Sequence, residues 1–189
     1  MKKIEFKKGK WEDEFQYVKS YRFNQTVSFI QEDNYIRNNI SDKFADGYEY
    51  INISTKNKYK TNTKITTHLS FESFGAPMIT FCEHYELDSV NKLRFNIYYE
   101  IVIFEDGINI WYLWKESNTC KWTKLDNIDL KLQENTIHEL SVTILNDGLQ
   151  ITINNQDFFK KISNLPKEFF IGVGACENIN KIYDLIITE

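Results

Sequence analysis

The chain has 189 residues, a length that suits one domain and can bury a hydrophobic core without disulfides or metal ions. Its 23 Lys and Arg against 27 Asp and Glu give a formal net charge of −4, so the basic footprint of a nucleic-acid-binding protein is missing. No run approaches the roughly 18 apolar residues of a membrane span, so we expect neither a nucleic-acid nor a membrane partner.

Alternating apolar and polar residues predict β-strands along most of the chain. Only residues 129–136 and 155–163 are candidates for a helical turn. No linker, low-complexity tract or internal repeat occurs, so residues 1–189 are expected to form a single domain. In chain order, the predicted strand segments are 15–31 (one or two strands), 48–55, 63–73, 78–84, 93–105, 108–115, 121–125, 137–145, 149–155, 169–175 and 181–188.

Two long hairpins stand out in the second half of the chain. Asp106-Gly107 separates 93–105 from 108–115, and an Asn-Asp-Gly turn at 146–148 separates 137–145 from 149–155. Such turns between alternating apolar runs are the strongest short-range hairpin signal in a sequence. Many strands joined by turns predict an all-β jelly-roll sandwich of two antiparallel sheets.

The strand faces opposite the aliphatic residues combine aromatic rings with hydrogen-bonding groups. An aromatic ring offers an apolar plane to the C–H face of a sugar, while amide, carboxylate and guanidinium groups bind hydroxyls. We therefore predict non-catalytic, lectin-like binding of a saccharide on this face, the concave face of its sheet. Its candidate residues are Tyr50, Asn52, His68, His84, Arg94, Asn96, Tyr98, Glu100 and Trp111.

Two alternatives to an open saccharide face remain. Loops cover this face and its polar groups satisfy one another beneath them, or a one-residue slip in a strand exchanges the two sets of side chains.

Several segments resemble bacterial members of the concanavalin A-like lectin and glucanase superfamily, which includes laminin-G-like domains. They are Gly-Tyr-Glu-Tyr-Ile-Asn (47–52), Ser-Phe-Glu (70–72), Gly-Ala-Pro (75–77), Asn-Asp-Gly-Leu (146–149), Asn-Gln (155–156), Ile-Gly-Val-Gly (171–174) and Tyr-Asp-Leu-Ile-Ile (183–187). The resemblance covers about residues 45–188. It implies a concanavalin A-like jelly roll and carbohydrate as the commonest ligand, although a fold alone does not fix a function.

Glucanase-like members of that superfamily carry Glu-x-Asp-x-x-Glu on one strand. The nearest match here is Glu86-Leu87-Asp88, with Asn91 at the position of the final acid. An amide cannot protonate a leaving oxygen, so we expect no retaining glucanase chemistry and interpret the segment as a loop.

Two other functions are compatible with the sequence. The first is a sugar-modifying enzyme, glycosidase-like, in which Glu100, His68 and His84 meet across neighbouring strands. The second is a protein-interaction module that uses the aromatic face. The identity of the sugar and the oligomeric state stay open.

No cofactor is expected from the sequence. The resemblance implies at most a structural calcium ion near Asp184, although one carboxylate is a weak signal because calcium takes six to eight oxygen ligands. Cys82, Cys120 and Cys176 form no C-x-x-C pair, and we expect three free thiols, with Cys120 the most reactive in an exposed turn. The charged N-terminal segment lacks the apolar core of a signal peptide, which favours the cytoplasm.

Overall fold

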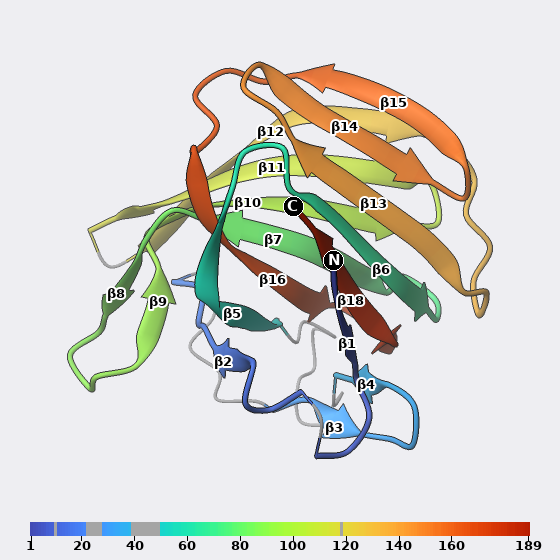
Figure 1. Cartoon of the computed structure of the whole chain (residues 1–189), viewed down its shortest axis with the longest axis horizontal. Helices are drawn as coiled ribbons and strands as arrows, with labels where there is room; N and C mark the ends of the chain where they lie inside the picture. The colour runs from blue at the N-terminus through green and yellow to red at the C-terminus, as the bar shows by residue number, and fades with distance from the viewer. Residues whose placement is uncertain (10, 22–27, 39–49, 118) are drawn as a thin grey trace.

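The structure is a computed structural model that describes residues 1–9, 11–21, 28–38, 50–117 and 119–189 (Figure 1). Every regular element in these ranges is a β-strand, and the two large sheets are antiparallel, which confirms the all-β jelly-roll sandwich. The described residues contain no helix of the length and hydropathy that a bilayer span requires. Residues 22–27, 48 and 49, which belong to two of the expected strand segments, lie outside the described residues.

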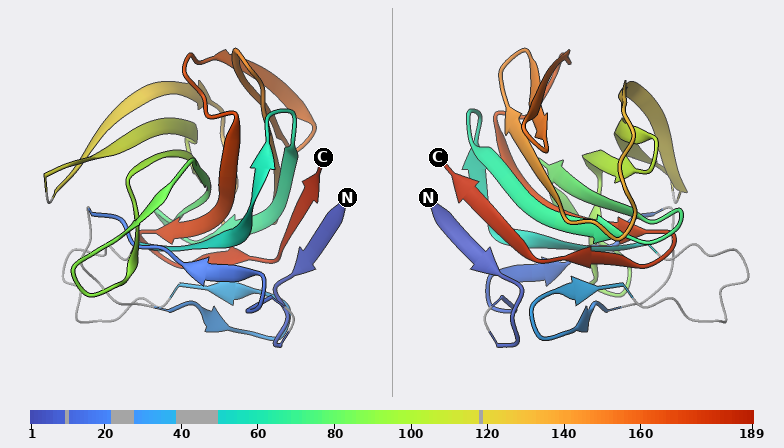
Figure 2. Two further views of the ribbon diagram at one scale, coloured as in Figure 1. Left: turned by 60° about the vertical axis from the view of Figure 1, so that its left-hand side comes forward. Right: turned by 90° about the vertical axis from the view of Figure 1, so that its right-hand side faces the viewer.

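The first layer is a seven-stranded sheet (Figures 1 and 2). Its strand order is β12 (Thr119–Asp129), β11 (Gly107–Glu116), β10 (Ile97–Phe104), β7 (Ala76–Cys82), β16 (Glu168–Cys176), β5 (Ile51–Lys60) and β2 (Phe15–Tyr17).

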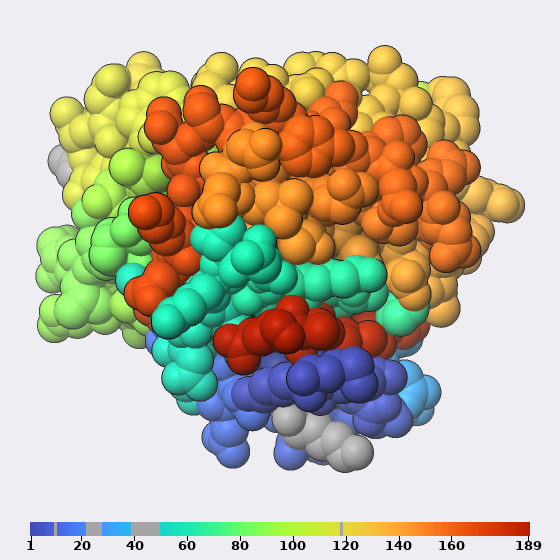
Figure 3. Space-filling model, turned by 45° about the horizontal axis from the view of Figure 1, so that its top comes forward, coloured from blue at the N-terminus to red at the C-terminus, as the bar shows by residue number. Residues whose placement is uncertain are grey.

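The second layer is a nine-stranded sheet. Its main path runs β15 (Gln156–Lys161), β14 (Gly148–Ile153), β13 (His138–Ile144), β6 (Lys64–Phe71), β17 (Asn180–Ile182), β4 (Ile36–Arg37) and β3 (Ile30–Gln31). In addition, β18 (Asp184–Thr188) pairs with β6 and with β1 (Lys2–Glu5). Figure 3 shows the outer face of this sheet, with β15, β14, β13, β6, β18 and β1 side by side. A separate hairpin joins β8 (Tyr85–Leu87) to β9 (Leu93–Phe95).

The hydrophobic core fills the space between the two large sheets. The seven-stranded sheet contributes Ile53, Ile79 and Ile101, and the nine-stranded sheet contributes Leu69 and Val142, all fully buried. Each such side chain stabilises the fold by about 1.5–3 kcal/mol relative to an exposed one. Alternation in the sequence places Ile53, Ile79, Ile101 and Leu69 on the apolar side of their strands, and this is the core side in the structure.

Both long hairpins are confirmed. β10 and β11 meet at Glu105-Asp106, and Gly107 has φ +136°, where a Cβ atom would lie 2.0 Å from the Ile128 carbonyl oxygen. Only glycine fits that position. β13 and β14 form the second hairpin around the turn that precedes Gly148.

Several details of the strand prediction were wrong. Segment 181–188 is two strands, β17 and β18, which separate at Tyr183. Segment 93–105 is not one strand but two, β9 and β10, which separate at Asn96. Residues 155–163 contain β15 rather than a helical turn, and 129–136 contain no helix. The expected short strand 121–125 is the middle of the longer β12, which pairs with β11 over its whole length.

β12 carries a β-bulge opposite β11. Ile110 pairs with Asp126 whereas Trp111 pairs with Lys124, so Leu125 is an extra residue on β12. A bulge bends its strand and redirects the side chain of the inserted residue.

Candidate functional site

The outer face of the seven-stranded sheet is divided into a covered part and a cavity. The covered part lies under the β8–β9 hairpin and residues 18–21. The cavity lies over the remainder of β10 and its neighbouring strands. The predicted open face and its first alternative, a face covered by other segments, therefore each hold for part of the sheet.

Tyr98 marks the covered part. Its ring is 1% exposed and stacks on Phe95 with centroids 4.3 Å apart, and its hydroxyl lies 2.8 Å from Ser20 Oγ. Arg94 secures the cover: its Nε donates to Asp88 Oδ2 at 2.9 Å and its Nη1 to the Ser20 carbonyl oxygen at 2.9 Å. Tyr98 and Arg94 therefore hold the hairpin on the sheet.

The open part is a cavity of about 240 Å³, which we call the Glu100 cavity. It runs across the strands, from β12 through β11, β10 and β7 to β16. Its aromatic and polar lining includes Tyr50, Phe74, Glu100, Asn109, Trp111 and Trp122. Three of the nine predicted ligand residues, Tyr50, Glu100 and Trp111, are thus brought together in one cavity.

Glu100 lies at the centre of the cavity floor. Its side chain is 4% exposed, and Tyr50 Oη donates a hydrogen bond of 2.8 Å to Glu100 Oε1. Burial, together with the negative charge of Glu100, raises the pKa of Tyr50 well above its usual value, so the tyrosine stays a donor. Trp111 lies directly opposite Glu100 on β11, and Thr80 lies opposite it on β7.

No second carboxylate lies beside Glu100 on this face of the described strands. Its neighbours along β10 are Tyr98 and Val102, and the residues opposite and diagonal to it on β7 and β11 are Thr80, Cys82, Met78, Trp111, Leu113 and Asn109. A retaining glycosidase places its two carboxyl groups about 5–5.5 Å apart. Glu105 and Glu177 do line the cavity, but from beyond the ends of β10 and β16.

Asn52 shares this outer face and is buried against β16. A Cβ atom at Gly172 would lie 2.3 Å from Thr80 Oγ1 and 2.8 Å from Asn52 Oδ1, and one at Gly174 would lie 2.5 Å from Asn52 Nδ2. The two glycines therefore make room for the Asn52 side chain, which accepts a hydrogen bond from Thr80 Oγ1 at 3.2 Å.

The expected grouping of His68, His84 and Glu100 was wrong. His68 lies on β6 of the other sheet, where its Nδ1 is 2.9 Å from Asp184 Oδ1 and its Nε2 is 3.3 Å from Glu139. His84 lies in the exposed link after β7, beside Glu83. Alternation assigns a residue to one side of its strand, but it does not say to which sheet the strand belongs.

Asn96 also lies outside the cavity. It is exposed at the break between β9 and β10, and its carbonyl oxygen accepts a hydrogen bond from the Lys115 backbone N–H at 2.8 Å. The sequence analysis treated segment 93–105 as one strand and therefore assigned Arg94 and Asn96 to the face of Glu100. The break between β9 and β10 makes that assignment wrong.

The carboxylate of Asp184 binds groups of the protein itself. Its Oδ1 accepts the backbone N–H of His68 at 3.0 Å and lies next to the ring of the same residue, and its Oδ2 lies 3.7 Å from Lys3 Nζ. Within the described ranges, no group of three or more His, Cys, Asp or Glu residues is arranged to hold a metal ion.

The glucanase-like segment forms part of the β8–β9 hairpin, so the expectation of a loop was only half right. Glu86 lies on β8 and accepts hydrogen bonds from Lys115 Nζ, at 2.6 Å, and from Tyr21 Oη. Asp88 and Asn91 form the hairpin turn, in which Asn91 has φ +58°. These side chains hold the cover in place and do not line the Glu100 cavity.

Three aromatic residues of the cavity, Phe74, Phe104 and Trp122, were missed by the sequence analysis. Phe74, in the β6–β7 turn, is 71% exposed and has φ +59°, a conformation that bulky residues rarely adopt. Trp122, on β12, is 47% exposed. The signal for Phe74 was an aromatic residue beside glycine in a turn, where no core packing needs one.

The three cysteines, all among the described residues, form no disulfide and are buried. The expected exposure of Cys120 was wrong, because its side chain packs beneath the hairpin cover with Tyr98 and Leu113. Burial raises the pKa of the Cys82 thiol to about 12.

The chain resembles known proteins in structure and not in sequence. No protein-family model and no curated protein sequence matches the chain. A glycoside hydrolase family 16 endo-glucanase from Bacteroides ovatus superposes with a TM-score of 0.63 at 11% identity, over 99% of both chains. A pseudo beta-1,3-glucanase of Mycobacterium tuberculosis gives 0.61 at 7% identity, over 99% of this chain and 97% of the other.

A carbohydrate-binding module of family 66 from Bacillus subtilis gives a TM-score of 0.56 at 8% identity, over 88% of this chain and 94% of the other. At such identities the comparisons describe the fold alone. The chain therefore has a concanavalin A-like jelly-roll fold.

Proposed function

We propose that this protein binds a saccharide in the Glu100 cavity without hydrolysing it. The observation that carries the proposal is the combination, in one cavity, of the aromatic side chains Trp111 and Trp122 with the carboxylate of Glu100. Indole rings offer flat apolar surface to a sugar ring, and a carboxylate accepts hydrogen bonds from its hydroxyls.

The size of the cavity supports a short ligand. Its volume of about 240 Å³ is below the range of roughly 300–1,000 Å³ that is usual for drug-sized ligands. A single sugar unit, with its neighbours extending toward solvent past Phe74 and Trp122, suits this space.

Proteins of the same fold also support a carbohydrate ligand. Their names describe an endo-glucanase, a pseudo beta-1,3-glucanase and a carbohydrate-binding module. One fold hosts catalytic and non-catalytic members, so the choice between them rests on the site itself. The residues surrounding Glu100 on the sheet are amides, hydroxyls, aromatic and apolar groups, which suits binding rather than a two-carboxylate mechanism.

One observation favours glycoside hydrolysis as a second candidate. Glu105 and Glu177 line the same cavity as Glu100, so three carboxyl groups face one space. A hydrolase would need two of these groups to act as an acid and a nucleophile or base.

The test is a glycan array of neutral and charged oligosaccharides, followed by calorimetry with the strongest binder. We expect Trp111→Ala and Trp122→Ala each to weaken binding by about 0.5–1.5 kcal/mol or more, because stacking surface is lost. His84→Ala is the control, since His84 lies in an exposed link outside the cavity. A silent array, or binding that both tryptophan variants retain in full, contradicts the proposal.

A reducing-end assay on the same oligosaccharides separates the two candidates. A binding protein releases no product, and Glu100→Gln still retains a folded site. Turnover that disappears in Glu100→Gln would instead identify a hydrolase.

A further inference from the structure

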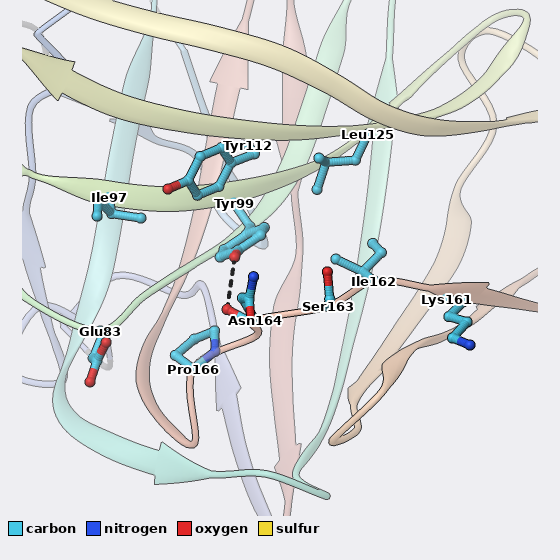
Figure 4. A pocket seen from close by; sticks show the side chains of 10 residues that line it. All are labelled: Glu83, Ile97, Tyr99, Tyr112, Leu125, Lys161, Ile162, Ser163, Asn164 and Pro166. Carbon is cyan, nitrogen blue, oxygen red and sulfur yellow. Dashed lines mark hydrogen bonds between the residues drawn. The ribbon is translucent and has the colours of Figure 1, made fainter.

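A second and larger cavity lies on the opposite side of the seven-stranded sheet. It has a volume of about 500 Å³ and opens between the ends of the two sheets, where β10, β11 and β12 face the loop from Ile162 to Pro166. We call it the inter-sheet cavity. Figure 4 shows Tyr112 and Leu125 extending from the strands toward this loop, with the Tyr99 ring between them and the loop.

The floor of the inter-sheet cavity is formed by Tyr99 and Tyr112, the middle two of a series of four aromatic rings. Tyr99 stacks on Phe81 with centroids 4.7 Å apart and an interplanar angle of 8°. Tyr112 follows at 5.2 Å from Tyr99, and Trp114 at 5.4 Å from Tyr112. These spacings are those of favourable aromatic pairs, and the two tyrosine rings give the cavity an aromatic surface against which another ring can pack.

Aliphatic side chains form the walls. Ile97 is 45% exposed and Leu125 is 39% exposed, and both line the cavity together with Ile162 and Pro166. Leu125 is the extra residue of the β12 bulge, which adds its side chain beside Tyr112. Bulges that redirect a side chain occur frequently beside binding sites.

The centre of the cavity carries no formal charge among its described lining residues. Glu83 and Lys161 are the charged residues of this lining, and their charges are opposite. Figure 4 shows them at opposite ends of the cavity, with Lys161 pointing away from the other labelled side chains. Neutral polar groups are present: the hydroxyls of Tyr112 and Ser163, and the side-chain amide of Asn164.

Hydrogen bonds hold both sides of the cavity in place. Tyr99 Oη donates to the Asn164 carbonyl oxygen at 3.2 Å, which fixes the loop against β10. Lys160 Nζ donates to Asp126 Oδ1 at 3.1 Å, which joins β15 to β12 beside the bulge. A site that exists before the ligand arrives loses less entropy on binding.

We propose that the inter-sheet cavity binds an uncharged ligand that consists of an aromatic ring with a hydroxyl group, a phenol or aryl alcohol. The ring lies against Tyr112 between Leu125 and Ile97, and its hydroxyl exchanges hydrogen bonds with Ser163 or Asn164. Aliphatic walls suit such a ring better than a saccharide, whose many hydroxyls would lose their partners there. This site is separate from the Glu100 cavity, and neither proposal depends on the other.

The experiment is a titration of the full chain with p-cresol, followed by amide chemical-shift changes in NMR spectra. We expect saturable shifts at residues around Tyr112 and Ser163, and binding at least tenfold weaker in Leu125→Asp, which introduces a charge at the exposed edge of the site. Ile137→Asp is the matched control, because Ile137 is 53% exposed and outside the cavity.

Three results would overturn the proposal. They are no saturable shift with p-cresol, equal affinity in Leu125→Asp, and binding of 4-methylbenzoate as tight as that of p-cresol. Thermal melting of both aspartate variants shows whether they are folded, and both changes replace exposed side chains. The glycan titration is repeated with Leu125→Asp and should be unchanged, so failure at one cavity is distinguishable from failure at the other.

Discussion

Glu100 on β10 lies directly opposite Trp111 on β11, and both side chains emerge from the outer face of the seven-stranded sheet. The preceding residue on β10, Tyr99, is paired with the following residue on β11, Tyr112, and these two face the other side. One pair of strands therefore supplies the floors of two cavities, because successive side chains on a strand point to opposite faces.

The hydrogen bond from Tyr50 to Glu100 should contribute to stability. Tyr50→Phe removes one donor from a buried carboxylate, and we expect the free energy of unfolding to fall by about 1–3 kcal/mol. Urea denaturation measures this change. Tyr183→Phe is the control: its hydroxyl lies 3.3 Å from Ser70 Oγ near the surface, and the expected change is below about 0.5 kcal/mol. Equal effects of the two variants would contradict the importance of the Glu100 bond.

Gly172 should tolerate no side chain. Gly172→Ala places a methyl group against Thr80 Oγ1 and Asn52 Oδ1, and overpacking of this kind destabilises by about 1–3 kcal/mol. Thermal or urea unfolding provides the measurement. The double variant Gly172→Ala/Thr80→Ala should recover part of the loss, because the nearest of the three close atoms, which also include the Ile53 carbonyl oxygen, is then absent. Full additivity of the two changes would show that the contact with Thr80 is not the cause.

The β8–β9 hairpin should weaken in acid. The backbone N–H of Lys92 and the guanidinium of Arg94 hold the pKa of Asp88 below its ordinary value of 3.8. A carboxyl group whose pKa is lower in the folded protein adds stability above its unfolded pKa, and that stability disappears as the pH falls through the folded pKa.

Amide hydrogen exchange of the hairpin, and urea unfolding between about pH 5 and pH 2, test this expectation. Asp88→Asn keeps an acceptor oxygen but has no charge to lose, so its unfolding free energy should depend less on pH than that of the wild-type chain. Identical acid dependence in the two proteins would rule out this role for Asp88.

The three thiols should be protected in the folded protein. Cys82, Cys120 and Cys176 are buried, and burial raises the pKa of Cys82 to about 12, so little thiolate forms near neutral pH. Titration with Ellman's reagent at pH 8 should be slow for the native chain and should count three thiols after denaturation without reductant. A count of one would reveal a disulfide and would argue against a reducing compartment.

Local patterns were sufficient to predict much of the fold. In β10, the alternation placed Tyr99, Ile101 and Ile103 toward the core and Glu100 on the other face, and this assignment is confirmed. The Asp-Gly and Asn-Asp-Gly turns likewise identified both long hairpins, because the backbone of a tight turn restricts which residues can form it.

The arrangement of the site depends on contacts that alternation does not report. His68 alternates correctly within β6, but β6 joins the other sheet, and pairing between distant segments is set by the whole core. The hairpin that covers Tyr98 consists of two strands of three residues each, which is too short for a periodic signal. The bulge at Leu125 interrupts the period in β12, so its place beside Tyr112 followed only from the structure.

The turn between β10 and β11 has a consequence for how this protein tolerates insertions. Gly107 closes that turn against the Ile128 carbonyl oxygen, and the turn sets which residue of β11 faces which residue of β10. One inserted residue that shifted this register would turn Trp111 toward the core and Tyr112 toward the outer face, and both cavities would lose their floors together. Surface loops usually accept length changes freely. Here a two-residue connection sets the strand register on which two binding surfaces depend.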